Sequence, residues 1–214
     1  MAGYIKLIMT SKSKHWDRIF SDSEDASLGW FETDLTTTFR LLDEIENWQE
    51  STLFISGAGT SLLIDALMNR EVSMVINDIS CEALTKLKKR LGHSQQSIDW
   101  LCQDIAQPFQ QEIATINIWL DRAVLHFLTE ETNINGYFNN LKQHLVIKGY
   151  AIFAEFSTIG ATQCAGLKIH QYSVEELSQR LGSTFKLMTH FESTFINSGG
   201  NEKPYIYALY QKIA

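Results

Sequence analysis

Leu53-Phe54-Ile55-Ser56-Gly57-Ala58-Gly59-Thr60-Ser61 is the stretch of sequence that decides the fold. A short apolar run leads directly into two glycines separated by one residue, and a segment of helical period follows. Glycine lets the backbone turn tightly and lets a ligand approach it, and the first turn of a helix presents free N–H groups. The stretch predicts a strand, a turn and a helix that can bind a ligand, although such a turn needs glycine even without a ligand.

Short apolar runs and segments of helical period continue to alternate after this stretch, a pattern typical of βα units on a mostly parallel sheet. The predicted strands are Thr52 to Ser56, Ser73 to Asn77, Ile98 to Cys102, Ile116 to Leu120, and Tyr150 to Phe156. The predicted helices are Ser61 to Asn69, Cys81 to Leu91 and Glu131 to Val146, with a short one near Ala123 to Leu128.

The two ends of the chain have different patterns. A helix that begins at the capping box Ser173-x-x-Glu176 ends at Gly182, and the apolar runs 185–191 and 205–210 predict an antiparallel hairpin at one sheet edge. Before the first strand, a helical stretch runs from Asp34 to Trp48, and no linker follows it. We therefore predict a single α/β domain over residues 1–214, a three-layer αβα sheet that is mostly parallel with an antiparallel last strand, under an N-terminal helical cover over 1–50.

The composition excludes several classes of protein. The chain is 44% hydrophobic and contains two prolines, which argues against disorder. Its 18 basic and 25 acidic side chains give a net charge of −7, without the electrostatic footprint of a general nucleic-acid binder. Met1 to Thr10 contains only a short apolar run, so we expect neither a signal peptide nor a membrane span, and a cytoplasmic protein.

The three cysteines, Cys81, Cys102 and Cys164, show neither a CxxC motif nor the spacing of metal ligands. We therefore expect no disulfide and no metal site, but buried thiols in a reducing compartment.

Asp78 is the second informative residue, because it ends the next strand, 21 residues beyond Gly57. A carboxylate in this place can accept hydrogen bonds from both hydroxyls of a ribose, or it can simply cap the helix that follows. Leu62 occupies the third glycine position of a dinucleotide motif, and no Gly-Lys-Ser/Thr is present. A nucleoside without a diphosphate therefore fits better than NAD.

Two more acids end later strands. Asp104 follows the third strand, where it can accept a hydrogen bond from an adenine amino group, and Asp121 ends the fourth. With Asp78, they are expected at the carboxyl edge of the strands, where open α/β sheets bind their ligands.

From His15 to Lys212 these motifs, taken in order, resemble the class I S-adenosylmethionine-dependent methyltransferases, which have a seven-strand Rossmann-like sheet. The resemblance implies S-adenosylmethionine as cofactor, cofactor-binding βα units over 51–156, and an acceptor-lid region with the C-terminal hairpin over 157–214. The cofactor-binding residues that it implies are Trp16, Gly57, Ala58, Gly59, Ser61, Asp78, Ile79, Asp104, Ile105 and Asp121.

Within that class, His15-Trp16-Asp17, Gly29-Trp30-Phe31 and the Asp-Arg-x-x-x-His stretch from Asp121 to His126 are similar to protein lysine methyltransferases that act on elongation factor or citrate synthase. Bacterial small-molecule and thiol methyltransferases share much of this frame. The expected acceptor is therefore a small nucleophile or a protein side chain, lysine included, and the expected state is a monomer or homodimer.

Ile55 departs from the family pattern, which has an acid two residues before the first glycine. That acid helps to hold the amino group of the methionine part of the cofactor. In this chain, backbone carbonyls or a residue of the N-terminal cover must hold it instead.

Methyl transfer from a sulfonium is an in-line displacement that depends mainly on alignment. Asp121 and His126 are the candidate catalytic residues, as base or orienting group for an amine acceptor, although His126 is equally well explained as a half-buried helix residue. Trp16 or Trp30 can stabilise the sulfonium charge or simply anchor the cover. Glu155 lies at the same predicted edge and is a candidate to face the acceptor.

Two alternatives remain open from the sequence. Ile55 is compatible with a non-catalytic module that binds an adenosyl ligand on a methyltransferase frame. Another nucleotide-dependent enzyme is the second alternative, and Leu62 argues against it.

Overall fold

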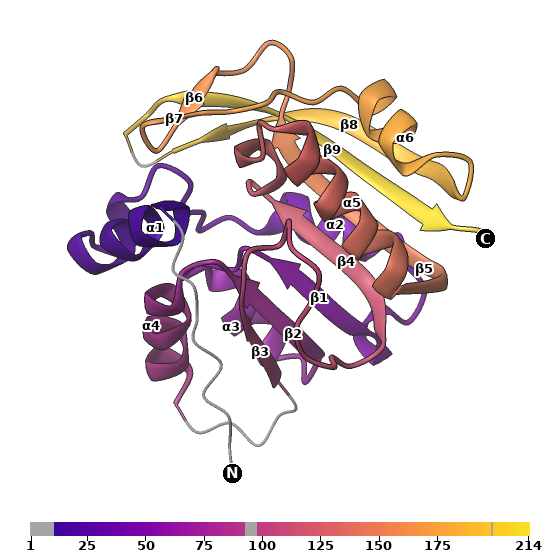
Figure 1. Ribbon diagram of the computed structural model, residues 1–214, viewed down its shortest axis with the longest axis horizontal. Coiled ribbons are helices and arrows are strands. Elements are labelled where there is room, and N and C mark those ends of the chain that lie inside the picture. Colours follow the sequence, from indigo (N-terminus) through magenta and orange to yellow (C-terminus); the bar gives the residue numbers. More distant parts are fainter. Residues whose placement is uncertain (1–10, 93–97, 198) are drawn as a thin grey trace.

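The computed structural model describes residues 11–92, 98–197 and 199–214, and its centre is a seven-stranded sheet with helices on both faces (Figure 1). The strand order is β3-β2-β1-β4-β5-β9-β8. The strands are β1 (Thr52–Ser56), β2 (Ser73–Asp78), β3 (Ile98–Cys102), β4 (Ile116–Arg122), β5 (Leu145–Phe156), β8 (Phe185–Ile196) and β9 (Glu202–Lys212). A separate two-stranded ribbon is formed by β6 (Gln163–Cys164) and β7 (Leu167–Lys168).

Strand direction agrees with the prediction. β3, β2, β1, β4 and β5 pair in parallel, and β9 pairs in antiparallel direction with both β5 and β8. The α/β class and the antiparallel last strand are therefore confirmed.

The helices cover the two faces separately. They are α1 (Ser11–Asp22), α2 (Thr36–Leu42), α3 (Leu62–Met68), α4 (Cys81–Leu91), α5 (Glu131–His144) and α6 (Val174–Leu181). The face that carries Ile55 and Leu120 packs against α2, α3 and α4, and the face that carries Phe54 and Trp119 packs against α5 and α6. Neighbours in a strand point to opposite faces, so these continuous apolar runs are buried on both sides.

Serine side chains cap three of these helices, and the cap at Ser173 is the one that the capping box predicts. Ser61 accepts a hydrogen bond from the backbone N–H of Leu63, and Ser80 from that of Ala83. Ser173 accepts one from the N–H of Glu176. Each cap satisfies a backbone donor that the first helical turn leaves free.

Several helices and strands begin or end at other residues than the sequence predicts. The helix expected over Asp34 to Trp48 is only α2, since the chain turns after it and Asn47 has a φ of +53°. β4 continues two residues beyond Leu120, so Asp121 and Arg122 belong to the strand itself. The short helix near Ala123 to Leu128 is a 3-10 turn, η3 (Leu125–Phe127).

The N-terminal cover is held on the sheet mainly through α4. The Asp17 carboxylate in α1 accepts hydrogen bonds from the Ser80 hydroxyl, at 2.7 Å, and from the Glu82 N–H, at 3.2 Å. The Lys86 ammonium group donates to the carbonyl oxygen of Phe20. α1 therefore lies over the carboxyl ends of the central strands (Figure 1). No helix in the described parts of the chain combines the length and the apolar character that crossing a membrane requires.

A disulfide joins Cys81 to Cys102, with their Cα atoms 5.4 Å apart, so the expectation of free thiols is wrong for this pair. Asp78 pairs with Cys102 in the β2–β3 register, and α4 begins three residues after Asp78. The parallel pairing of β2 with β3 brings the two cysteines together, and no local sequence motif predicts this contact. Cys164 is a buried free thiol, as expected.

We expect the double variant Cys81→Ser/Cys102→Ser to lose roughly 2–3 kcal/mol of unfolding free energy, because the bond closes a loop of about 20 residues in the unfolded chain. Urea unfolding without reductant measures the loss. A reductant should lower the stability of the wild type and leave the double variant unchanged. Equal stability of both proteins without reductant would contradict the expectation.

Candidate cofactor-binding site

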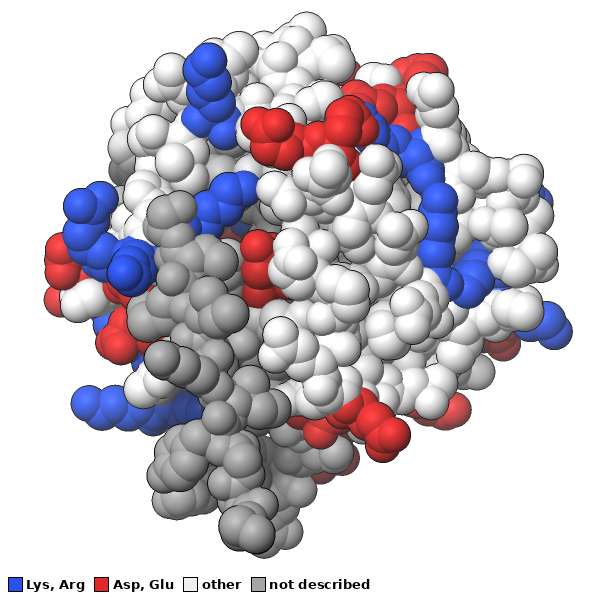
Figure 2. Space-filling model, in the orientation of Figure 1, with Lys and Arg blue, Asp and Glu red and all other residues white. Residues whose placement is uncertain are grey.

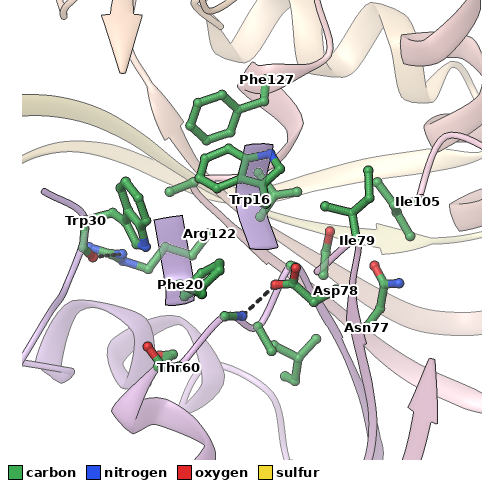
Figure 3. A pocket seen from close by; sticks show the side chains of 18 of the residues that line it. Trp16, Phe20, Trp30, Thr60, Asn77, Asp78, Ile79, Ile105, Arg122 and Phe127 are labelled. Carbon is green, nitrogen blue, oxygen red and sulfur yellow. Dashed lines mark hydrogen bonds between the residues drawn. The ribbon is translucent and has the colours of Figure 1, made fainter. Parts of the chain in front are cut away.

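A cavity lies at the carboxyl ends of β1, β2 and β4, between the sheet edge and the N-terminal segment (Figure 3). Nine of the ten predicted cofactor-binding residues line it: Trp16, Gly57, Ala58, Gly59, Ser61, Asp78, Ile79, Asp104 and Ile105. Asp121, the tenth, does not line it. The βα pattern thus locates the cavity from sequence.

The glycine loop after β1 forms the floor of the cavity. Gly57 and Gly59 have φ angles of +51° and +52°, and a Cβ on Gly57 would lie 2.3 Å from Cγ2 of Val124. Only glycine adopts this conformation cheaply while leaving room for η3. The Ala58 N–H donates to the carbonyl of Asn77 at 2.8 Å, which holds the loop against the end of β2.

Asp78 joins the glycine loop to α4. Its carboxyl oxygens accept hydrogen bonds from the N–H of Gly59, at 2.7 Å, and of Ser80, at 2.8 Å (Figure 3). Burial raises the pKa of Asp78 to about 6, against the lowering effect of these N–H groups, and the nearby Asp17 raises it further. Each carboxylate oxygen has a second lone pair, so the group can also accept hydrogen bonds from a ribose diol on the cavity side.

The predicted adenine end is formed by the loop after β3. The Asp104 carboxylate accepts a hydrogen bond from the Ala106 N–H at 2.9 Å, and the Asn77 side-chain amide donates to the carbonyls of Leu101 and Gln103. Ile79 and Ile105 add apolar surface to the cavity wall. This end therefore combines one carboxylate with apolar side chains, and such a combination suits a purine.

Aromatic side chains form the opposite wall. The rings of Trp16 and Phe127 meet edge to face with centroids 4.8 Å apart, and those of Trp16 and Trp30 are 5.5 Å apart. Phe20 and Phe31 of the N-terminal segment complete the wall. Edge-to-face packing of this kind stabilises an apolar surface and excludes water.

Asp121 and His126, the predicted catalytic residues, are fully buried and do not line the cavity. Asp121 follows Leu120 in the strand, so its side chain points to the opposite face of the sheet from Leu120 and Arg122. Its Oδ1 accepts hydrogen bonds from the N–H groups of Val124 and Leu125, at 3.1 and 3.3 Å. The structure therefore places Asp121 beneath η3 and His126 within η3, both as positioning residues.

Glu155, also expected to face the acceptor, is fully buried in the same cluster. His126 Nδ1 lies 2.6 Å from Glu155 Oε2, which also accepts a hydrogen bond from the His126 N–H at 3.2 Å. Burial lowers the pKa of His126 to about 3, so the ring is neutral and the 2.6 Å contact is a hydrogen bond rather than an ion pair.

The two carboxyl groups of this cluster both have raised pKa values. Burial raises the pKa of Glu155 to about 7, and burial and the neighbouring Glu155 raise that of Asp121 well above its ordinary value. Asp121 Oδ2 and Glu155 Oε1 have no hydrogen-bond partner among the described residues, and a proton held between the two carboxyl groups would satisfy both atoms. The cluster thus fixes η3, whose Phe127 forms part of the cavity wall.

The predicted acceptor lid over 157–172 contributes no residue to the cavity. His170 Nε2 instead lies 2.8 Å from the Glu176 carboxylate, and Cys164 and Tyr172 are buried. This segment packs on β5 and α6.

Glu32 and Arg122 line the cavity and were missed by the sequence reasoning. Arg122 Nε lies 2.8 Å from Glu32 Oε2. The alternation of side chains in β4 would have placed Arg122 on the face of Ile55. Glu32 lies in an irregular segment without any periodic signal.

The chain is similar to known methyltransferases. Residues 55–153 match the family described as methyltransferase domain. Residues 55–153 thus contain a methyltransferase domain, and the fold is that of S-adenosylmethionine-dependent methyltransferases. No curated protein sequence matches the chain.

Solved structures with this methyltransferase fold cover nearly the whole chain. An S-adenosylmethionine-dependent methyltransferase from Anabaena variabilis is 16% identical, with a TM-score of 0.75 over 94% of this chain and 93% of that one. The N-methyltransferase NodS from Bradyrhizobium japonicum, in complex with S-adenosylhomocysteine, is 14% identical, with a TM-score of 0.72 over 95% and 99%. The 1,6-didemethyltoxoflavin N1-methyltransferase from Burkholderia thailandensis is 13% identical, with a TM-score of 0.65 over 95% and 85%.

The variant Glu155→Gln should flatten the dependence of stability on pH. Because the pKa of Glu155 is raised from 4.5 to about 7, the stability linked to its proton is complete below pH 4.5 and is lost as the pH rises through 7. Between pH 5 and 8 the wild type should lose roughly 1–3 kcal/mol more unfolding free energy than the variant.

Urea unfolding at both pH values measures this difference, and Glu192→Gln, at an exposed site on β8, is the matched control. The opposing effect of His126, whose stability contribution is lost as the pH falls below 6.5, is common to all three proteins. Parallel pH curves for the wild type and Glu155→Gln would contradict the assignment.

Proposed function

We propose that the domain transfers the methyl group of S-adenosylmethionine to a small-molecule nucleophile, as an enzyme of class EC 2.1.1. The observation that carries the proposal is the glycine loop bound to the Asp78 carboxyl group at the wall of the cavity. Structures with the same fold include methyltransferases of small molecules, which agrees with this choice.

The residues of the cavity fit the cofactor. Asp78 offers free lone pairs to a ribose, Asp104 and the adjacent apolar side chains suit adenine, and the glycine loop leaves space for the methionine part. When bound, S-adenosylmethionine supplies an electrophilic methyl group on a sulfonium. The aromatic wall keeps water from the acceptor, and its Trp16 and Trp30 rings can stabilise positive charge.

The cavity favours an acceptor that needs little help to lose its proton. Among the described residues that line it there is no histidine, tyrosine or cysteine, and Glu32 is engaged by Arg122. Asp121 lies beneath η3, His126 is a buried residue of η3, and neither lines the cavity. A thiol, an acidic hydroxyl or another small nucleophile that loses its proton readily therefore suits the site better than a protonated lysine side chain.

Further properties belong to the same proposal: a monomer or homodimer that acts in the cytoplasm without nucleic acid, membrane or metal. The net charge of −7 supports the lack of a nucleic-acid partner, and on the face shown in Figure 2 basic side chains are interspersed with acidic ones. In the described residues no group of three or more His, Cys, Asp or Glu can hold a metal ion. The Cys81–Cys102 disulfide is unusual for a reducing compartment, so thiol trapping in fresh cell extracts tests the cytoplasmic assignment.

Calorimetric titration tests the proposed function. S-adenosylhomocysteine should bind, NAD should not, and Asp78→Asn should weaken S-adenosylhomocysteine by roughly 10-fold to 100-fold, since a charged acceptor for the ribose is lost. Asp22→Asn, on the exposed end of α1, is the matched control. Unchanged affinity in Asp78→Asn, with a melting temperature near that of the wild type, would remove Asp78 from the site.

A further inference from the structure

A buried ion pair forms one end of the cavity. Arg122 Nε lies 2.8 Å from Glu32 Oε2, and the two side chains are only 12% and 9% exposed. Arg122 Nη1 also donates to the Trp30 carbonyl at 3.2 Å (Figure 3), and its guanidinium lies 4.9 Å from the centroid of the Phe195 ring. These contacts fix the guanidinium beside the N-terminal segment.

The pair lies on the same face of the sheet as Ile55. Ile55 is level with Leu120 in the parallel β1–β4 pairing, and Arg122 is two residues beyond Leu120 in the same strand. Residues two apart in a strand share a face. The N-terminal segment thus supplies an acid, Glu32, to the face and edge where β1 itself carries only an apolar side chain.

The order of groups along the sheet edge assigns the pair to one end of the ligand. Asp104 follows β3, Asp78 ends β2, the glycine loop follows β1, and Arg122 ends β4. With adenine beside Asp104 and ribose beside Asp78, the remaining part of the nucleoside ligand extends past Gly57 toward β4. Arg122 and Glu32 are charged groups that line the cavity on this side, and Lys12 of α1 is a further charged group in its lining.

Burial of the Glu32–Arg122 ion pair costs free energy when no ligand is bound. Taking two charges out of water is repaid only when their remaining hydrogen-bonding atoms are satisfied, and Arg122 Nη2 is buried without a hydrogen-bond partner in the part of the chain that the structure describes. Burial raises the pKa of Glu32, and the Arg122 charge opposes that effect. A zwitterion placed against the pair would supply a carboxylate for the guanidinium and an ammonium for Glu32.

We propose that Glu32 and Arg122 bind the α-amino acid end of the cofactor, with Glu32 accepting hydrogen bonds from its ammonium group and Arg122 donating from Nη2 to its carboxylate. The proposal rests on the proposed function and explains how Ile55 can replace an acid in β1. Both residues bind the cofactor and neither takes part in bond making.

Three nucleosides separate the parts of this site by calorimetry, without any turnover. S-adenosylhomocysteine carries the ammonium and the carboxylate, its decarboxylated analogue keeps only the ammonium, and 5′-methylthioadenosine lacks both. The wild type should bind S-adenosylhomocysteine roughly 100-fold more tightly than methylthioadenosine, with the decarboxylated compound between them.

Glu32→Gln should weaken S-adenosylhomocysteine and the decarboxylated analogue by roughly 10-fold or more and leave methylthioadenosine within about 3-fold. The double variant Glu32→Gln/Arg122→Met removes both buried charges together, which a fold tolerates better than loss of one partner. It should bind the three nucleosides with nearly equal affinity. Asp34→Asn, two residues from Glu32, exposed and still able to cap Thr36, is the matched control and should behave as the wild type.

Failures of the two proposals are distinguishable. If the wild type binds methylthioadenosine as tightly as S-adenosylhomocysteine, the assignment of Glu32 and Arg122 is overturned and the adenosyl site stands. An equal loss for all three nucleosides in both the single and the double variant makes the pair a structural element and also overturns the assignment. If no adenosyl compound binds to the wild type, the proposed function itself fails.

Discussion

The carboxyl group of Asp78 is the contact on which the geometry of the site depends. It accepts one backbone hydrogen bond from the loop after β1, at Gly59, and another from the start of α4, at Ser80. Two glycines with positive φ are expensive to order, and these bonds to a buried acid offset that cost. The same group thus closes the loop, anchors the helix that holds α1, and presents its free lone pairs to the cavity.

A second set of buried acids fixes the position of η3, which forms part of the cavity wall. Asp121 and Glu155 hold η3 through its backbone N–H groups, and His126 completes the cluster as a neutral donor. The polar residues that the sequence suggests for chemistry therefore determine the position of an apolar wall. Transfer from a sulfonium requires alignment more than proton transfer, and such a division of roles meets that requirement.

The sheet and most of the predicted cavity lining could be located from the sequence, because parallel strands bring their carboxyl ends to one edge, where Asp78 ends β2 and Asp104 comes shortly after β3. The roles of Asp121 and His126 could not, since they depend on whether β4 ends before or after Asp121, and therefore on which face its side chain meets. The Cys81–Cys102 bond depends on strand register. Glu32 comes from an irregular segment, where no periodicity relates sequence to position.

The N-terminal segment provides one side of the cavity, with Trp16, Trp30 and Glu32. It is joined to the body of the protein by Asp17 of α1 and Lys86 of α4, and by the Glu32–Arg122 ion pair. A ligand in the cavity touches the segment and the sheet edge at once. A bound ligand therefore stabilises the attachment of the segment to the sheet. By thermodynamic linkage, attachment of the segment strengthens ligand binding by the same free energy. Ligand binding and the attachment of α1 and Glu32 to the sheet edge are therefore coupled in one equilibrium.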